Sequence, residues 1–321
     1  GREQLFAEQV PQVLKNLAEA TRVASIQAST AIEGYDVPTQ RAEQLARRPD
    51  ATFRNRNEQE FAGYRDAIDE LVRKQRREPI TPALPFYLAT RLHRYTTGEP
   101  GRAKIEQNYI ASYENGRRRI VFTPVAPDLT ESALRSLIAG YNEALEANAG
   151  HPVLLHGLFA LDFLAIHPVA DGNGRISRLL TVHELLRLGY GVARYVSVEQ
   201  LIFQNKNGYY DALEASQQGW HEAAHDPWPW LTYFVSILAE AYEQFETKVS
   251  AAHNAKGTKA EQARHYVLHE APPEFRFAEA NAALPGISSA TLRQVLNALR
   301  AEGKFVADRG PKAVWRRADG S

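Results

Sequence analysis

The sequence contains no cysteine among its 321 residues. This absence excludes disulfides, thiolate nucleophiles and cysteine-ligated zinc sites. Methionine is absent too. The motifs that carry the argument are compact and do not depend on spacings across long stretches. Long apolar runs are also missing, since none reaches the roughly 20 residues that a membrane-spanning helix needs. Without such a run or a secretory signal, we expect a cytoplasmic protein that does not bind membranes.

A net charge is missing as well, because 38 Lys and Arg residues balance 38 Asp and Glu residues. A neutral chain is not, as a whole, a basic nucleic-acid binder. The charge is unevenly distributed, however: residues 256–321 contain 11 basic and 7 acidic residues, a net +4, which leaves −4 for the remainder. Apolar residues make up 44%, too many for a disordered chain, and the length suggests about two domains.

Apolar spacing predicts a mainly helical fold. The expected helices of the first 250 residues are about 10–34, 58–74, 84–95, 130–147, 152–166, 175–188, 198–216 and 228–247. The small, polar stretch 250–258 is expected to be a domain boundary. We therefore expect an N-terminal helical region at 1–50, a catalytic core at 51–250 and a small domain at 256–321.

The C-terminal stretch predicts two short helices at 260–270 and 277–283 and a longer one at 288–302. Leu292, Val295, Leu296 and Leu299 fall on one face of the longer helix. A small hairpin around Arg309-Gly310 follows at 304–315. Three helices and a hairpin resemble a winged helix-turn-helix, which could bind DNA or another protein.

The segment 107–122 has a different pattern, because Asn115-Gly116 separates two runs rich in strand-forming residues. Asn-Gly is a strong short-range signal for a β-hairpin, since both turn residues need positive φ. The ordinary interpretation is an edge hairpin with solvated arginines at 117–119.

The most informative segment is 166–180, which reads IHPVADGNGRISRLL. An apolar helix runs into His167, and Pro168 prevents its simple continuation. Gly172 and Gly174 then precede the next helix. Glycine-rich backbone entering a helix N-terminus forms an anion site, because unpaired N–H groups and the helix dipole both favour phosphate.

The side chains of this segment suit phosphoryl or nucleotidyl transfer. Arg175 and Arg178 share a helix face and can both contact phosphate oxygens. Asp171 is a hard oxygen ligand suited to Mg²⁺, and His167 can accept a proton near neutral pH. A capped corner between two helices with surface arginines is the simpler alternative. The segment lacks the Gly-Lys-Ser/Thr of a P-loop. It is not an EF-hand loop either, because Val182, and not a glutamate, is the twelfth residue counted from Asp171.

This segment resembles the signature of the Fic family, H-x-F-x-D/E-G-N-G-R-x-x-R, with Val169 in place of the usual phenylalanine. The likeness extends over about residues 25–250, including the Asn115-Gly116 hairpin and the stretch 205–210. The resemblance implies a Fic-type helical core with a small hairpin flap, which would hold the target segment by strand addition at Tyr109, Ile110 and Ala111. It also implies a protein adenylyltransferase, which moves AMP from ATP to a Ser, Thr or Tyr hydroxyl of a target protein, or of itself. A homodimer is a further family-level expectation.

The resemblance also implies the roles of individual residues. His167 is the base that activates the target hydroxyl, and Asp171 holds Mg²⁺. The phosphates are cradled and neutralised by Gly172, Asn173, Gly174, Arg175 and Arg178. The related Doc branch has lysine at the position of Gly174 and transfers phosphate, so the glycine favours AMP transfer. Asn205 is a candidate adenosine contact, although a polar residue at a helix end is an equally plausible interpretation.

The segment from Ser29 to Gly34 matches the family's inhibitory pattern, S/T-x-x-x-E-G/N. Thr30 and Glu33 could instead form a capping box, but the apolar periodicity ends here and Gly34 suits a helix C-cap. A carboxylate in a last helical turn opposes the helix dipole, which suggests a cationic partner. By resemblance this partner is Arg178, and Glu33 would hold ATP in an unproductive pose. Some relatives with this glutamate also remove AMP, so a reverse activity stays open.

Two other interpretations remain. His221 and His225 fit the zinc-protease pattern H-E-x-x-H, but Asp226-Pro227 ends any helix there, so we do not expect zinc proteolysis. The alternative function is a DNA-binding transcriptional regulator, or a toxin–antitoxin-like module, whose Fic core only senses nucleotide.

Overall fold

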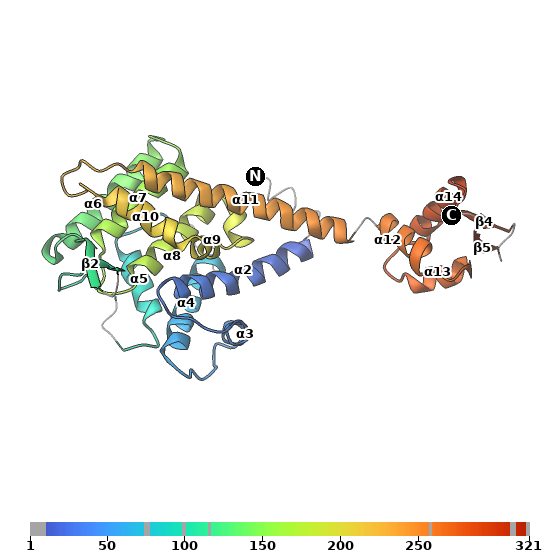
Figure 1. Ribbon diagram of the computed structural model, residues 1–321, viewed down its shortest axis with the longest axis horizontal. Coiled ribbons are helices and arrows are strands. Elements are labelled where there is room, and N and C mark those ends of the chain that lie inside the picture. The colour runs from blue at the N-terminus through green and yellow to red at the C-terminus, as the bar shows by residue number, and fades with distance from the viewer. Residues whose placement is uncertain are drawn as a thin grey trace. The chain divides into compact units, whose positions relative to one another are not determined.

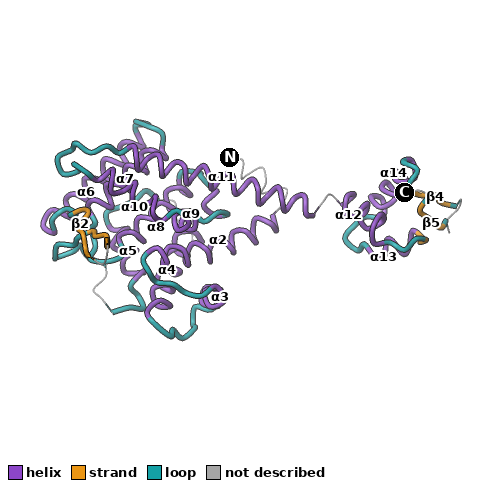
Figure 2. Tube along the Cα trace, viewed as in Figure 1, coloured by secondary structure: helices purple, strands orange, loops and turns teal. Residues whose placement is uncertain are grey.

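The computed structural model describes residues 11–73, 78–97, 101–114, 117–256, 259–308 and 313–318. The chain divides into two compact units, Gly1–Glu246 and Thr247–Ser321. The mainly helical fold class predicted from the sequence is confirmed (Figures 1 and 2). In the described ranges, no helix combines the length and apolar character needed to cross a membrane.

The first unit consists of helices and one two-stranded sheet (Figure 1). Its elements are α2 (Pro11–Ile32), α3 (Thr39–Arg47), α4 (Arg56–Arg73), α5 (Ala83–Leu92), β1 (Ile110–Glu114), β2 (Arg117–Phe122), α6 (Pro127–Glu146), α7 (Pro152–Ile166), α8 (Asn173–Arg187), a 3₁₀ turn η1 (Gly191–Arg194), α9 (Val198–Gln204), α10 (Lys206–Gln217) and α11 (Trp228–Lys256), which begins in this unit.

Helices α7 and α8 form the centre of the first unit. Most residues of both helices are buried, in keeping with a helix that is surrounded by protein on all sides. Phe163 and Ile166 of α7 and Ile176 and Leu180 of α8 belong to one core cluster with Phe61 of α4. The loop that joins these two helices carries the Fic-like signature, so its backbone is held at both ends by the core.

Helix α2 packs against α9 and α4. Ile26 and Ile32 are fully buried on its inner face. The helix ends at Ile32, and Gly34 follows with a φ of 88°, a left-handed conformation that glycine adopts without steric cost. The inhibitory pattern therefore lies in the last turn of the helix and just beyond it, and not at a helix start, where a capping box forms.

Strands β1 and β2 form an antiparallel pair in which Ser112 faces Arg119, with an irregularity between Ile110 and Ala111. The expected Asn115-Gly116 turn lies outside the described residues. At the other end of the hairpin, Phe122 is buried and anchors β2 to the body of the unit.

The helices of the first unit differ from the sequence-based expectations in two places. The single helix expected at 198–216 is two helices that meet at Asn205, whose φ of −118° and ψ of 46° are not helical. Helix α3 was not expected either. Helix α11 continues to Lys256, through most of the stretch 250–258 where the sequence predicts a domain boundary. The residues before Lys256 are rich in alanine, which has the highest helix propensity and extends the helix.

The second unit is a small domain of helices around a three-stranded sheet. Beyond the end of α11 it comprises α12 (Lys259–His265), a π-helical turn η2 (Tyr266–Glu270), β3 (Glu274–Arg276), α13 (Phe277–Ala283), α14 (Ser289–Ala301), β4 (Phe305–Ala307) and β5 (Val314–Arg317). The strands are antiparallel in the order β3-β5-β4. Strand β3 was not expected because three residues give no periodic signal, and the Arg309-Gly310 turn lies outside the described residues.

Candidate active site

The C-terminal end of α7 fixes the orientation of the His167 ring. His167 caps the helix in a left-handed conformation, with a φ of 54° and a ψ of 62°. Its backbone N–H donates to the carbonyl of Phe163 at 2.9 Å, and its Nδ1 lies 3.1 Å from the carbonyl oxygen of Leu164. A carbonyl can only accept a hydrogen bond, so Nδ1 carries the proton and Nε2 keeps a free lone pair. The ring is therefore arranged as a base.

The surroundings keep His167 neutral. Burial is the main cause that lowers the pKa of His167 to about 4, and the nearby ammonium of Lys104 lowers it further. The hydrogen bond to Leu164 and the carboxylates of Glu33 and Asp171 act in the opposite direction. At neutral pH the imidazole is therefore unprotonated and can accept a proton at Nε2.

Helix α8 begins at a tight loop. Gly172 is its N-cap residue and has a φ of 91°. The buried side chain of Asn173 holds the loop closed, because its Oδ1 accepts from the N–H of Val169 at 3.0 Å and its Nδ2 donates to the Val169 carbonyl at 2.7 Å. Val169 itself is buried in the core, the packing position expected of the family's phenylalanine. The first amides of α8 have no intrahelical acceptor, which makes this helix entry suited to bind an anion.

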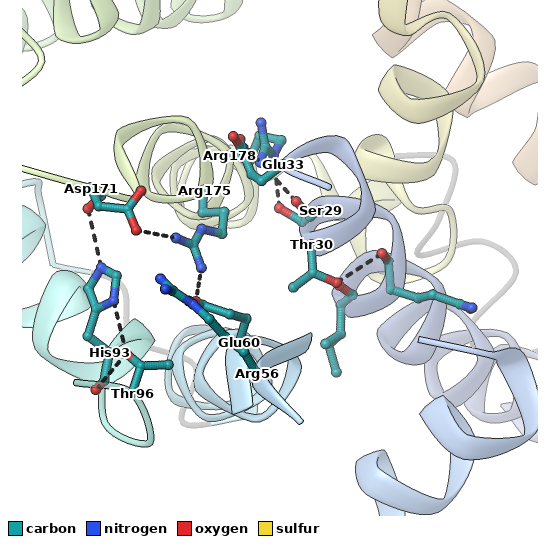
Figure 3. A network of polar contacts seen from close by, with 12 residues as sticks. Ser29, Thr30, Glu33, Arg56, Glu60, His93, Thr96, Asp171, Arg175 and Arg178 are labelled. Carbon is teal, nitrogen blue, oxygen red and sulfur yellow. Dashed lines mark hydrogen bonds and ion pairs between the residues drawn. The ribbon is translucent and has the colours of Figure 1, made fainter. Parts of the chain in front are cut away.

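The two arginines of the motif point to different partners (Figure 3). Arg175 is 1% exposed and forms a buried ion pair with Glu60 of α4, and it lies 3.4 Å from the Asp171 carboxylate. Arg56 holds the other oxygen of Glu60 at 3.1 Å. Arg178 instead faces α2. Arg175 and Arg178 thus have different protein partners, and their binding of phosphate oxygens stays a proposal.

The Asp171 carboxylate has the properties of a magnesium ligand. Its side chain is 56% exposed and only loosely paired with Arg175, at 3.4 Å. One ligand atom each of Glu60, His93 and Asp171 lies within 4.8 Å of the others, but Glu60 is already engaged by two arginines. Mg²⁺ prefers one or two carboxylates completed by water and phosphate oxygens, so this donor set fits it through Asp171.

Arg178 binds the end of α2 through three hydrogen bonds (Figure 3). Its Nη2 donates to a carboxylate oxygen of Glu33 at 2.7 Å and to the backbone carbonyl of Ser29 at 3.0 Å. Its Nε donates to the hydroxyl of Ser29 at 2.8 Å. Burial is the largest single influence and opposes the charged form, but Glu33, Tyr209 and Tyr64 together raise the pKa of Arg178. The sequence-based pairing of these residues thus corresponds to a direct contact.

Glu33 also lies against the entry of α8. A Cβ atom added to Gly174 would lie 2.6 Å from Oε1 of Glu33, closer than a Cβ atom approaches a non-bonded atom. Among the described residues, Nη1 of Arg178 is buried and has no hydrogen-bond partner. An additional acceptor such as a phosphate oxygen could satisfy this group. Glu33 therefore lies beside the place where the helix entry and Arg178 can together bind an anion.

A buried polar network that sequence reasoning missed holds the middle of α2. Glu199 of α9 accepts hydrogen bonds from Ser25 of α2 at 2.8 Å and from Tyr64 of α4 at 3.0 Å. Ser197 joins the network at 3.2 Å from Glu199. In the sequence, Glu199 follows a serine N-cap and looks like an ordinary acidic first-turn residue, so no signal distinguishes it.

Lys206 is a second contact to the end of α2 that was not predicted. Its ammonium donates to the carbonyl of Ile32 at 2.5 Å, where a cation is favoured by the helix dipole. The neighbouring Asn205 forms the break between α9 and α10, and its side chain lies against Gly208. A Cβ on Gly208 would lie 2.6 Å from Asn205 Oδ1. Asn205 thus has a clear role at a helix end, and an adenosine contact is an additional proposal.

The remaining predicted residues lie at the hairpin and in a turn. Tyr109 is 46% exposed, and Ile110 and Ala111 begin β1. His221 and His225 lie in a turn region rather than on a helix, and Ala223 between them has a φ of 53°. His221 also contacts the carbonyl of Thr123 at 2.8 Å. The H-E-x-x-H pattern is therefore not arranged as in a helical zinc site.

Comparison with known proteins places the signature in a family. Residues 83–185 match the sequence model of the Fic/DOC family. A protein of Culex quinquefasciatus named protein adenylyltransferase Fic is 35% identical over 88 residues, which are 27% of this chain and 16% of that protein. A protein of the same name from Aedes aegypti is 30% identical over 120 residues, 37% of this chain and 17% of that protein. The matched segments thus span less than a fifth of these curated relatives.

Solved structures show a similar fold. A Fic family protein from Desulfovibrio desulfuricans is 21% identical, with a TM-score of 0.60, and the alignment covers 100% of this chain and 93% of that chain. A Fic domain containing signaling protein from Bacteroides thetaiotaomicron is 20% identical, with a TM-score of 0.62, over 78% of this chain and 97% of that chain. At these identities the similarity establishes the fold and not the activity.

Proposed function

The chain carries a Fic/DOC domain at residues 83–185, and from this we propose that it is a protein adenylyltransferase. The observation that carries the proposal is the base His167, with a free Nε2, next to the anion-binding entry of α8. In the proposed reaction, a target Ser, Thr or Tyr hydroxyl oxygen attacks the α-phosphorus of ATP. The bond to the β-phosphate breaks, pyrophosphate leaves, and the hydroxyl proton moves to Nε2 of His167.

The other motif residues bind the nucleotide in this proposal. The amides of Gly172, Asn173 and Gly174 bind the phosphates, and Arg175 and Arg178 neutralise them, with Arg178 at the terminal phosphate. Asp171 would hold Mg²⁺, which supplies charge neutralisation on the phosphates. Asn205 contacts the adenosine, and β1 binds the target segment through its exposed edge at Tyr109–Ala111.

Glu33 restrains the reaction in the same proposal. Its carboxylate occupies Arg178 at 2.7 Å and lies against Gly174, so a terminal phosphate and Glu33 compete for one guanidinium. Like-charge repulsion between Glu33 and the phosphates then keeps ATP out of the productive pose. Displacement of α2 removes the block, and the reverse removal of AMP from a target uses the same residues.

Two labelled forms of ATP test the activity. The protein is incubated with ATP labelled either on the adenine or on the terminal phosphate, together with Mg²⁺. Adenine label retained on the protein or on a lysate protein supports AMP transfer, and terminal label alone contradicts it in favour of a kinase. His167→Ala is the control and is expected to abolish labelling.

A second candidate function belongs to the C-terminal unit. Helix α14 exposes Arg293, Gln294, Asn297 and Arg300, residue types that read base edges and phosphates. The unit would then be a winged helix that binds duplex DNA. Titration of a fluorescent duplex with the full chain tests this, since binding should weaken steeply with salt and should be lost in Gln294→Ala/Asn297→Ala. Salt-independent or absent binding would contradict it.

A further inference from the structure

Lys104 is a buried cation that the proposed reaction does not use. It lies in the loop between α5 and β1 and is 3% exposed. Burial lowers the pKa of Lys104 to about 8, so the ammonium form still predominates at neutral pH. Among the described residues no carboxylate forms an ion pair with it; its ammonium donates to the Asn108 side chain and to the Ile166 carbonyl. Burying a lysine ammonium among neutral acceptors costs folding free energy, which indicates that Lys104 has a specific role.

The acceptor on α7 shows what Lys104 does. The last four carbonyls of a helix lack donors from within the helix. In α7 each of the four accepts a hydrogen bond, either from the cap residue or from a residue outside the helix. His167 supplies two of the donors, through its backbone N–H and its Nδ1. The N–H of Val125 binds the Ala165 carbonyl at 3.2 Å, and Nζ of Lys104 binds the Ile166 carbonyl at 3.0 Å. Lys104 therefore completes the cap that orients the imidazole.

The segment 104–108 continues this contact along the catalytic loop. The backbone N–H of Lys104 donates to the Pro168 carbonyl at 2.9 Å. Nδ2 of Asn108 donates to the Val169 carbonyl at 3.1 Å, while its Oδ1 accepts from Nζ of Lys104 at 2.9 Å. Two residues after Asn108, strand β1 begins. The same short segment thus connects the hairpin to the residues on both sides of His167.

We propose that Lys104 is a positioning residue for His167: with Asn108 it fixes the left-handed turn that presents Nε2 and sets the position of the hairpin relative to that base. This inference rests on the proposed function, because it assigns Lys104 to the geometry of the same reaction. Lys104 does not contact a substrate, and it acts through the backbone at 166–169 and through its charge.

The charges around His167 give the inference a second, spectroscopic consequence. Besides burial, the groups that act on His167 are Lys104, Glu33, Asp171 and the Leu164 carbonyl. Of these, Lys104 is the cation and disfavours protonation of the imidazole. Replacing Lys104 by an uncharged residue therefore raises the pKa of His167. Admission of water would raise it too, because burial is the main cause of the low pKa. The comparison is therefore with Asn108→Ala, which disturbs the same segment but keeps the Lys104 charge.

The test uses Lys104→Met in a Glu33→Gly background, which removes the proposed inhibition. Methionine keeps the apolar stem and removes the charge and its donors. We expect the rate of self-modification at saturating ATP to fall about 10²-fold, as for a misplaced catalytic group. The half-saturating ATP concentration stays within about twofold, because Lys104 does not line the entry of α8. The exposed Lys248→Met is the matched control and leaves the rate unchanged.

Histidine NMR of the free protein supplies the readout that does not depend on activity. The ring signal of His167 is assigned by comparison with His167→Gln, and its pKa is expected to be higher in Lys104→Met than in the reference. An unchanged rate together with an unchanged pKa would overturn the inference. If Lys104→Met does not fold, Asn108→Ala serves instead, and an unchanged rate there has the same meaning. If the reference itself transfers no AMP, the proposed function fails, and the pKa comparison still decides the role of Lys104.

Discussion

At the scale of single residues, the site depends on contacts between side chains that are far apart in the sequence. Arg175 and Glu60 are separated by 115 positions, and both are almost completely buried. The Fic-like signature identifies Arg175, but nothing in the sequence around Glu60 marks it as the partner. The same holds for Glu199, which pairs with Ser25 across 174 positions. The motif residues could therefore be predicted, whereas the residues that hold them could not, because only the folded core brings them together.

The Glu60–Arg175 pair gives a prediction about stability. Removing one partner of a buried ion pair leaves an uncompensated charge, so Glu60→Gln should lower the free energy of unfolding by about 3–5 kcal/mol. Urea denaturation followed by circular dichroism measures it. The control is Glu131→Gln, whose exposed pair with Arg135 should contribute less than about 1 kcal/mol. Equal effects of the two substitutions would contradict this account of Arg175.

At the scale of elements, the position of α2 relative to α8 and α9 is the central feature of the molecule. The apolar spacing of α2 and the glycine after it predicted its end within about two residues, because local backbone preferences decide that boundary. The break at Asn205 was not predicted, because the apolar pattern continues across it and the packing of α10 decides the change in direction. Figure 3 shows α2 reaching the motif through Ser29 and Glu33.

Weakening the buried network of α2 should raise the proposed activity without changing Glu33. Ser25→Ala removes the hydroxyl that donates to Glu199, and loss of such a bond favours release of the helix by about 1–3 kcal/mol. We expect a several-fold rise in self-modification, measured as an initial rate. In a Glu33→Gly background the same substitution should add nothing, and the exposed Ser132→Ala should have no effect in either background. A similar rise in both backgrounds would show that Ser25 does not act through α2.

At the scale of the whole molecule, two buried histidines couple stability to pH. Burial lowers the pKa of His156 and of His167 to about 4, below the ordinary value of 6.5. Between these values the unfolded chain binds protons that the folded chain does not, so stability falls as the pH decreases from 6.5 towards 4. Above pH 6.5 neither group contributes to the pH dependence. Thermal unfolding across this range should show the decline.

His156 provides the matched substitution for this pH dependence. It lies 3.1 Å from the Thr181 hydroxyl, outside the proposed reaction. His156→Gln should make the decline in melting temperature between pH 6.5 and 4 shallower, because one of the two groups no longer titrates. A slope unchanged by this substitution would mean that His156 is not kept neutral by burial.

The most direct test of the account is intact-protein mass spectrometry after incubation with ATP and Mg²⁺. Three proteins are compared: the unsubstituted chain, Glu33→Gly, and Glu33→Gly combined with His167→Ala. The account predicts slow or no addition of AMP to the first, rapid addition to the second and none to the third. Equal rates for the unsubstituted chain and Glu33→Gly would contradict the restraint by Glu33, and AMP addition by the His167→Ala protein would contradict the base.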